Sequence, residues 1–165
     1  MHPKQPLKIL ISFLLPATLA LACSGSSKAP SSPPSIIATS QPESKLARAK
    51  SSPGAKVFFV DLKDGDTLTN PVTLKFGVEG IELAPAGEVK DNSGHHHLLI
   101  DIDPLPPMDA PLPSTQRIQH FGKAQNETTQ EIPPGPHTLQ LLFAGGNHVP
   151  HDPPVMSSKI NITVK

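Results

Sequence analysis

Histidine is the residue whose distribution in this chain points to chemistry. The chain has eight His, and seven of them lie between residues 95 and 151. They occur as the run His95-His96-His97, as the single residues His120 and His137, and as the spaced pair His148 and His151. Neutral imidazole binds copper, zinc and nickel. The clustering therefore points to a transition-metal site.

The run of three histidines can be divided by strand geometry. Residues two apart on a β-strand share a face, so His95 and His97 are predicted on one face and His96 on the other, with Leu98 and Ile100. The Cβ atoms of His95 and His97 would lie about 6.6 Å apart along the strand. At that separation the two rings can lean onto one metal ion.

The remaining histidines lie in or next to proline-rich loops. His148 and His151 belong to the segment 147–154, which has three Pro, and a stiff loop can hold ligands in place. His137 has the parity of Leu139 and is expected to be a hydrogen-bonded structural residue. Met108 and Met156 lie in similar loops and offer thioethers for Cu(I). The predicted metal ligands are His95, His97, His120, His148 and His151, and the predicted ion is copper or zinc.

The elements that must position these residues are predicted to be strands. In residues 56–165, apolar residues alternate with polar ones, for example in the segments 72–79 and 160–165, which is the period-two pattern of a half-buried strand. No segment has a sustained helical period. Prolines cluster at 104–113 and 150–154, between predicted strands. We expect an all-β domain, an immunoglobulin-like β-sandwich of about seven strands.

The N-terminal segment has the pattern of a targeting signal. Lys4 and Lys8 precede an apolar run over residues 9–22, which is shorter than the roughly 20 residues that a membrane-spanning helix needs. The run ends in LALAC, which resembles a bacterial lipoprotein cleavage box, although Ala20 stands where Leu is commoner. Residues 1–22 are therefore predicted to be a lipoprotein signal peptide, with Cys23 as the lipidated (palmitate-type) residue that anchors the protein to the membrane.

The predicted location follows from this signal. The protein is expected in the bacterial cell envelope. Because Ser24 replaces the Asp that favours inner-membrane retention, it is expected on the outer membrane facing the periplasm if the source is Gram-negative. Residues 23–55, rich in Ser, Pro and Ala, are expected to be a disordered tether.

Composition excludes several classes of function. Lys and Arg number 14 and Asp and Glu number 14, so a basic nucleic-acid binder is not expected. The single Cys excludes a disulfide scaffold and a thiolate-rich zinc site. The sequence lacks the motifs GxSxG, GxxxxGK[ST] and HExxH, and the protein is not expected to be an enzyme.

Several segments of residues 56–165 also resemble a known bacterial family. They are VFFVDLKDGDTLTNPVTLKFGVEG, GHHHLLID, HFGKAQNETTQEIPPGPHTLQLLF and NHVPHDPPVMSSKI. Their order and spacing are similar to those of domain of unknown function 4399, which occurs in secreted or lipid-anchored bacterial proteins. The resemblance implies a sandwich fold and an extracytoplasmic location, and it implies no catalytic residue.

Two functions are compatible with these observations. The first is a lipid-anchored domain that binds a transition metal, copper above all, through clustered His, as a buffer or carrier. The second is a non-catalytic envelope module whose proline-rich loops bind a protein or a glycan, with structural histidines. Convergence of the predicted ligands in the folded domain distinguishes the first from the second.

Overall fold

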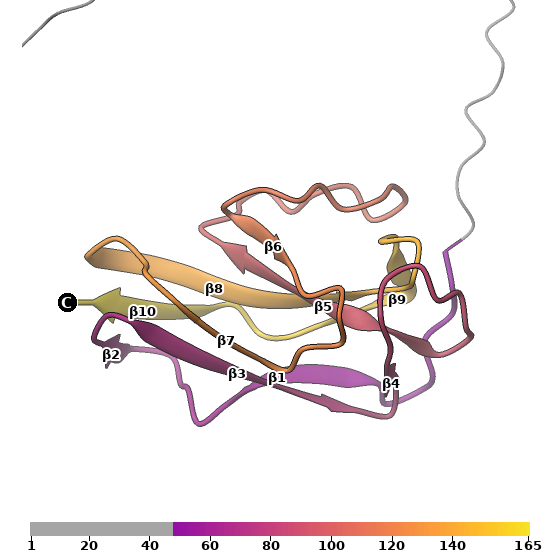
Figure 1. Cartoon of the computed structure of the whole chain (residues 1–165), viewed down its shortest axis with the longest axis horizontal. Helices are drawn as coiled ribbons and strands as arrows, with labels where there is room; N and C mark the ends of the chain where they lie inside the picture. Colours follow the sequence, from indigo (N-terminus) through magenta and orange to yellow (C-terminus); the bar gives the residue numbers. More distant parts are fainter. Residues whose placement is uncertain (1–47) are drawn as a thin grey trace, which may run out of the picture. The chain divides into compact units, whose positions relative to one another are not determined.

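The computed structural model describes residues 48–165 (Figure 1). The predicted signal peptide, Cys23 and the tether as far as residue 47 lie outside the described residues. The described part is all-β, and no helix occurs in it. Within these residues there is thus no helix long and apolar enough to cross a membrane. The strands are β1 (Lys56–Val60), β2 (Asp66–Leu68), β3 (Val72–Glu79), β4 (Glu82–Leu83), β5 (Ser93–Ile100), β6 (Ile118–His120), β7 (Glu127–Gln130), β8 (Gly135–Ala144), β9 (Pro150–Met156) and β10 (Ile160–Val164).

These strands form two sheets. The smaller sheet has the order β1-β3-β7, and the larger has the order β2-β10-β8-β5-β4, with β6 paired to β5 and β9 paired to β8. The structure thus has ten strands rather than about seven, because short strands at sheet edges, such as β2 and β4, leave little trace in the sequence. The all-β prediction is confirmed, whereas the immunoglobulin-like topology stays a prediction.

The main core lies between the two sheets. The alternating residues of β3, β5, β8 and β10 supply it, as the period-two pattern predicts. Leu74 and Phe76 come from the small sheet, and Leu98, Leu141 and Phe143 come from the large one. Figure 1 shows the two layers, with β1, β3 and β7 on one side and β5, β8 and β10 on the other.

The outer face of the large sheet is covered as well. The connection from β5 to β6 passes over this face (Figure 1), and its Leu112 packs with Leu99, Leu142 and Ala144 in a second apolar cluster. Every residue of β5 is therefore buried. The proline-rich connection, which the sequence marks only as a loop, is part of the packing of the sheet.

The folded domain begins before the predicted boundary at residue 56. Arg48 donates hydrogen bonds to the carbonyl oxygens of Pro150 and His151, and its guanidinium lies 3.3 Å from the Asp152 carboxylate. Asp152 in turn donates its N–H to the Ala49 carbonyl. Residues 48–51, expected to belong to the tether, thus lie against the start of β9 through the Arg48 side chain and the backbone hydrogen bonds of Ala49 and Ser51.

Candidate metal centre

Strand β5 sorts the three consecutive histidines as strand parity predicts. His96 points into the main core, where its ring packs on Phe76 and Phe143 at centroid separations of 5.3 and 5.2 Å. His95 and His97 lie on the outer face, and their ring centroids are 4.8 Å apart. The outer face of β5 therefore presents two adjacent imidazoles.

The third imidazole arrives through strand pairing. Antiparallel β6 places His120 directly opposite His97, and their ring centroids lie 5.3 Å apart. The His120 ring folds back over Gly122, where a Cβ atom would overlap its Cε1 and Nε2 atoms. Gly122 therefore allows His120 to turn toward His97.

The fourth imidazole comes from the turn between β8 and β9. His148 has a φ of 64°, in the left-handed region that residues other than glycine rarely adopt. Its N–H donates to the Gly145 carbonyl, and its own carbonyl accepts from the N–H of Leu112 in the β5–β6 connection. These bonds hold the turn in a shape that directs the His148 ring at the outer face of β5.

A loop after β4 contacts two segments that carry cluster residues, the end of the His120 strand and the His148 turn. The N–H of Ala86 donates to the Gly122 carbonyl at 2.9 Å, and the N–H of Gly87 donates to the Gly146 carbonyl at 2.8 Å. One loop thus fixes the position of the His120 segment relative to the His148 segment.

The four rings form one compact cluster. Their six centroid separations run from 4.6 Å for His120 and His148 to 6.0 Å for His97 and His148. The Nε2 atoms of His120 and His148 are 3.0 Å apart. Ligand atoms of His95, His120 and His148 all lie within 4.8 Å of one another. His97 is outside that group of three, but its ring centroid lies 4.8–6.0 Å from the other three centroids. We call these four residues the imidazole cluster.

Burial divides the imidazole cluster into a floor and a rim. His95 and His97 have 0% exposed surface, whereas His120 and His148 are half-buried. Burial, with the neighbouring imidazoles, lowers the pKa of His95 to about 4 and that of His97 to about 2. It also lowers the pKa of His120. The floor rings are therefore neutral at neutral pH, the form in which imidazole binds a metal.

The floor imidazoles also lack protein partners. Neither nitrogen of His95 and neither nitrogen of His97 has a hydrogen-bond partner in the described structure. A buried polar group without a partner typically costs about 1–3 kcal/mol. A metal ion between the rings would give one nitrogen of each ring a partner.

The structure does not bring His151 into the cluster. Its ring stacks on Phe143 at a centroid separation of 6.0 Å, and its Nε2 lies 3.1 Å from the Ser93 carbonyl oxygen. The spacing of His148 and His151 implies a shared loop, but β9 begins between them, at Pro150, which pairs with Ala144. We therefore leave His151 out of the ligand set. Met108 and Met156 pack against the apolar cluster of Leu99 and Leu142.

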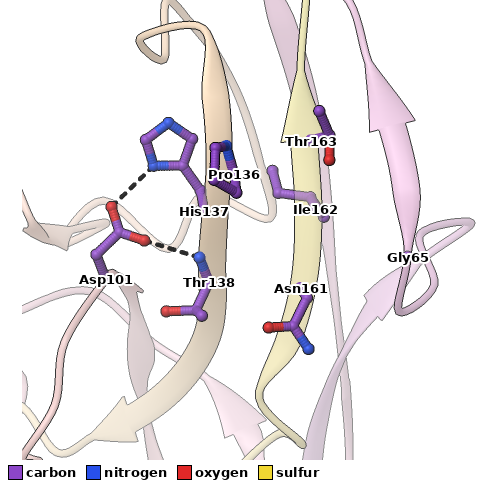
Figure 2. Close-up of a pocket in the computed structure, with 8 residues that line it drawn as sticks. All are labelled: Gly65, Asp101, Pro136, His137, Thr138, Asn161, Ile162 and Thr163. Carbon is purple, nitrogen blue, oxygen red and sulfur yellow. Dashed lines mark hydrogen bonds and ion pairs between the residues drawn. The ribbon is translucent and has the colours of Figure 1, made fainter.

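A second histidine site lies at the other end of β8 (Figure 2). His137 Nδ1 is 2.8 Å from Asp101 Oδ2, and its Nε2 is 2.8 Å from the Pro133 carbonyl oxygen. Asp101 also accepts the Thr138 N–H at 2.7 Å. The pair borders a pocket of about 230 Å³ together with residues 161–163 of β10. Both ring nitrogens therefore have protein partners, and His137 links the Asp101 side chain to the Pro133 carbonyl. This is the hydrogen-bonded structural role that its parity predicts.

Two features of the cluster have no clear signal in the sequence. The brace at Ala86 and Gly87 uses backbone groups alone, which any residue has. Gly122 was visible only as a glycine two residues after a histidine, and its steric role depends on how the His120 ring folds back.

Comparison with known proteins gives a family and no nearer relative. No curated protein and no solved structure matches the chain. Residues 74–165, more than half of the chain, match the family described as Domain of unknown function (DUF4399). The matched region contains all four residues of the imidazole cluster. The chain therefore belongs to the DUF4399 family.

Proposed function

We propose that this chain is a lipid-anchored domain of the bacterial cell envelope that binds one transition-metal ion, copper above all, as a buffer or carrier. The observation that supports the proposal is the meeting of four imidazoles from three separate segments of the chain. His95 and His97 come from β5, His120 from β6 and His148 from the β8–β9 turn.

The size of the cluster suits a single ion. A metal–nitrogen distance of about 2.0–2.1 Å in a tetrahedral His site places neighbouring ring centroids about 5 Å apart. The observed separations of 4.6–6.0 Å bracket that value. Small rotations of the rings would then bring one nitrogen from each onto a shared ion.

The donor set supports copper among the divalent metals. Imidazole binds copper, zinc and nickel, and the affinity of a given nitrogen site for divalent ions is highest for copper. Four protein ligands fill a tetrahedral shell, whereas a catalytic metal site keeps one position open for water or substrate. The cluster is thus suited to storage or delivery of the ion rather than to catalysis.

The proposed anchorage places this domain at a membrane. The N-terminal charged and apolar segments and Cys23 support lipidation. Replacing Cys23 with Ser should release the protein from the membrane fraction when the cell fractions are immunoblotted. An unchanged distribution of the Cys23→Ser protein would contradict the anchor and leave the metal site unaffected.

The metal proposal is tested by titration of the full chain, purified without a His tag. We expect calorimetry with Cu(II) and with Zn(II), together with metal analysis, to give one tightly bound ion per chain. His120→Ala should weaken that binding at least tenfold. His137→Ala is the matched control, because it removes an imidazole from the same sheet that already has two protein partners.

Two results would refute metal binding as the function of the cluster. One is the lack of stoichiometric binding of Cu(II), of Zn(II) and of copper offered as Cu(I). The other is equal loss of affinity in His120→Ala and in the His137→Ala control. Either result would favour the alternative, an envelope interaction module in which the histidines have a structural role.

A further inference from the structure

We infer that the imidazole cluster holds copper as Cu(I) in preference to Cu(II) and Zn(II). This inference rests on the proposed metal-binding function and adds the oxidation state of the ion. It has three supports: the shape of the cluster, the charge of its ligands and the burial of its floor.

The shape of the cluster is tetrahedral rather than planar. In a planar square of four rings, two pairs lie across the diagonals, and both of these pairs are the most widely separated. Here the longest separation, 6.0 Å, joins His97 and His148, but the other two rings are only 4.8 Å apart. The four remaining separations are 4.6–5.3 Å. The four rings therefore cannot lie in a square.

This shape distinguishes the two oxidation states of copper. Cu(II) prefers square-planar or tetragonal nitrogen sites. Flattening the cluster would require His120 or His148 to move relative to β5. Backbone hydrogen bonds from Ala86, Gly87 and Leu112 oppose that movement. Cu(I), which has a filled d shell, has no preference for a planar arrangement and loses nothing in a tetrahedral site.

The charge of the ligands distinguishes Cu(I) from Zn(II), which also accepts a tetrahedral site. Ligating histidines usually donate their second N–H to a carboxylate, a carbonyl or water, which makes them stronger ligands. Among the described residues, His95 and His97 have no such hydrogen-bond partner, and imidazole itself is an uncharged ligand. Four neutral ligands leave the full charge of the ion uncompensated.

Burial turns this difference in charge into selectivity. The cost of moving an ion from water to a site of low dielectric constant rises with the square of its charge. His95 and His97 have 0% exposed surface, and the β5–β6 connection covers the neighbouring sheet face. A monovalent ion is therefore disfavoured less than a divalent ion at the same position.

The test is a set of equilibrium competitions on the untagged full chain. Cu(I) is offered without oxygen against bathocuproine disulfonate, and Cu(II) and Zn(II) are offered against chelators of known affinity. We expect the chain to bind Cu(I) at least 100-fold more tightly than either divalent ion. Ag(I), a monovalent ion with a filled d shell, should compete with Cu(I) and serves as an oxygen-stable second probe.

The reduction potential of the bound copper provides an independent readout. Each tenfold preference for Cu(I) over Cu(II) raises the potential by about 59 mV for a one-electron couple. His148→Asn should lower both the Cu(I) affinity and the reduction potential, because it removes one of the four imidazole ligands. Asn tolerates the left-handed backbone at this position. Because the His148 side chain is only half-buried, we expect the variant to fold.

The outcomes separate the two proposals. Binding of Cu(II) or Zn(II) that equals or exceeds binding of Cu(I) overturns the inference and leaves the metal-binding function standing. A lack of binding of all three ions overturns both. A Cu(I) preference that His148→Asn leaves unchanged also overturns the inference, because the preference would then arise outside the cluster.

Discussion

The imidazole cluster and His137 lie on the same large sheet and differ in how their ring nitrogens are satisfied. Both nitrogens of His137 have protein partners, Asp101 and the Pro133 carbonyl. Within residues 48–165, the nitrogens of His95 and His97 have no hydrogen-bond partner, although these rings are fully buried. A histidine that the protein satisfies by itself needs no ligand. The convergence of His95, His120 and His148 forms a group that could hold a metal ion.

The largest expected effect comes from removing the rim of the imidazole cluster. The double variant His120→Ala/His148→Asn removes two of the four ligands. We expect copper affinity to fall more than about 100-fold, because loss of a residue that only hydrogen-bonds a metal ligand already costs about 10–100-fold. His137→Gln should leave the affinity unchanged. Calorimetry on the three proteins measures the difference, and a similar loss in His137→Gln would remove the distinction between the two regions.

Addition of metal should stabilise the fold. An ion that binds only the native chain, at a free concentration 100 times its Kd, stabilises that chain by about 2.7 kcal/mol. We expect urea midpoints to rise accordingly with copper for the unaltered protein and for His137→Gln, and not for the double rim variant. A rise of equal size in the rim variant would show that the ion binds elsewhere.

Gly122 offers a sharper test of geometry, with a smaller effect. In Gly122→Ala, the new Cβ would overlap the His120 ring and displace its Nε2. We expect about tenfold weaker metal binding, equivalent to about 1.4 kcal/mol. In a His120→Ala background, Gly122→Ala should have no further effect on affinity, because the displaced ring is gone. A full additional loss in that background would mean that Gly122 acts through some other contact.

The smallest effect is expected at Asp101 and His137. The hydrogen bond to Asp101 raises the pKa of His137. Burial raises the pKa of Asp101, but hydrogen bonds from His137 and the Thr138 N–H outweigh it and lower the pKa overall.

These shifts define the pH range in which the pair stabilises the fold. The His137 contribution is complete below its ordinary pKa of 6.5 and is lost as pH rises through the raised value. The Asp101 contribution is complete above its ordinary pKa of 3.8 and is lost as pH falls through the lowered value.

Asp101→Asn should therefore destabilise the protein more at pH 5.5 than at pH 8.5. Because the Asp101 side chain is 37% exposed, solvent screening limits the loss to under about 1 kcal/mol. Urea unfolding at both pH values measures it, and an equal loss at both would show that the charge on His137 does not matter.

The local part of this architecture could be predicted from the sequence. Alternation along single strands places His95 and His97 on one face and His96 on the other, and the parity of His137 with Leu139 indicates a structural role. These inferences succeed because successive side chains point to opposite faces of a strand, whatever the strand pairs with.

The non-local part could not be predicted in the same way. His120 faces His97 because of the register in which β6 pairs with β5. His151 lies apart from His148 because β9 pairing begins between them. The prolines at 104–113 were predicted only to lie between strands. In the structure Leu112 anchors their connection to the sheet, and the Leu112 N–H holds the His148 turn.

The central claim is that His95, His97, His120 and His148 hold one ion together. Anomalous diffraction from crystals of the copper-loaded chain, recorded at the copper absorption edge, tests it most directly. The account predicts one strong peak per chain, enclosed by these four rings and about 2.0–2.1 Å from a nitrogen of each. A peak beside His137 or His151, or the lack of any peak among the four rings, would contradict it.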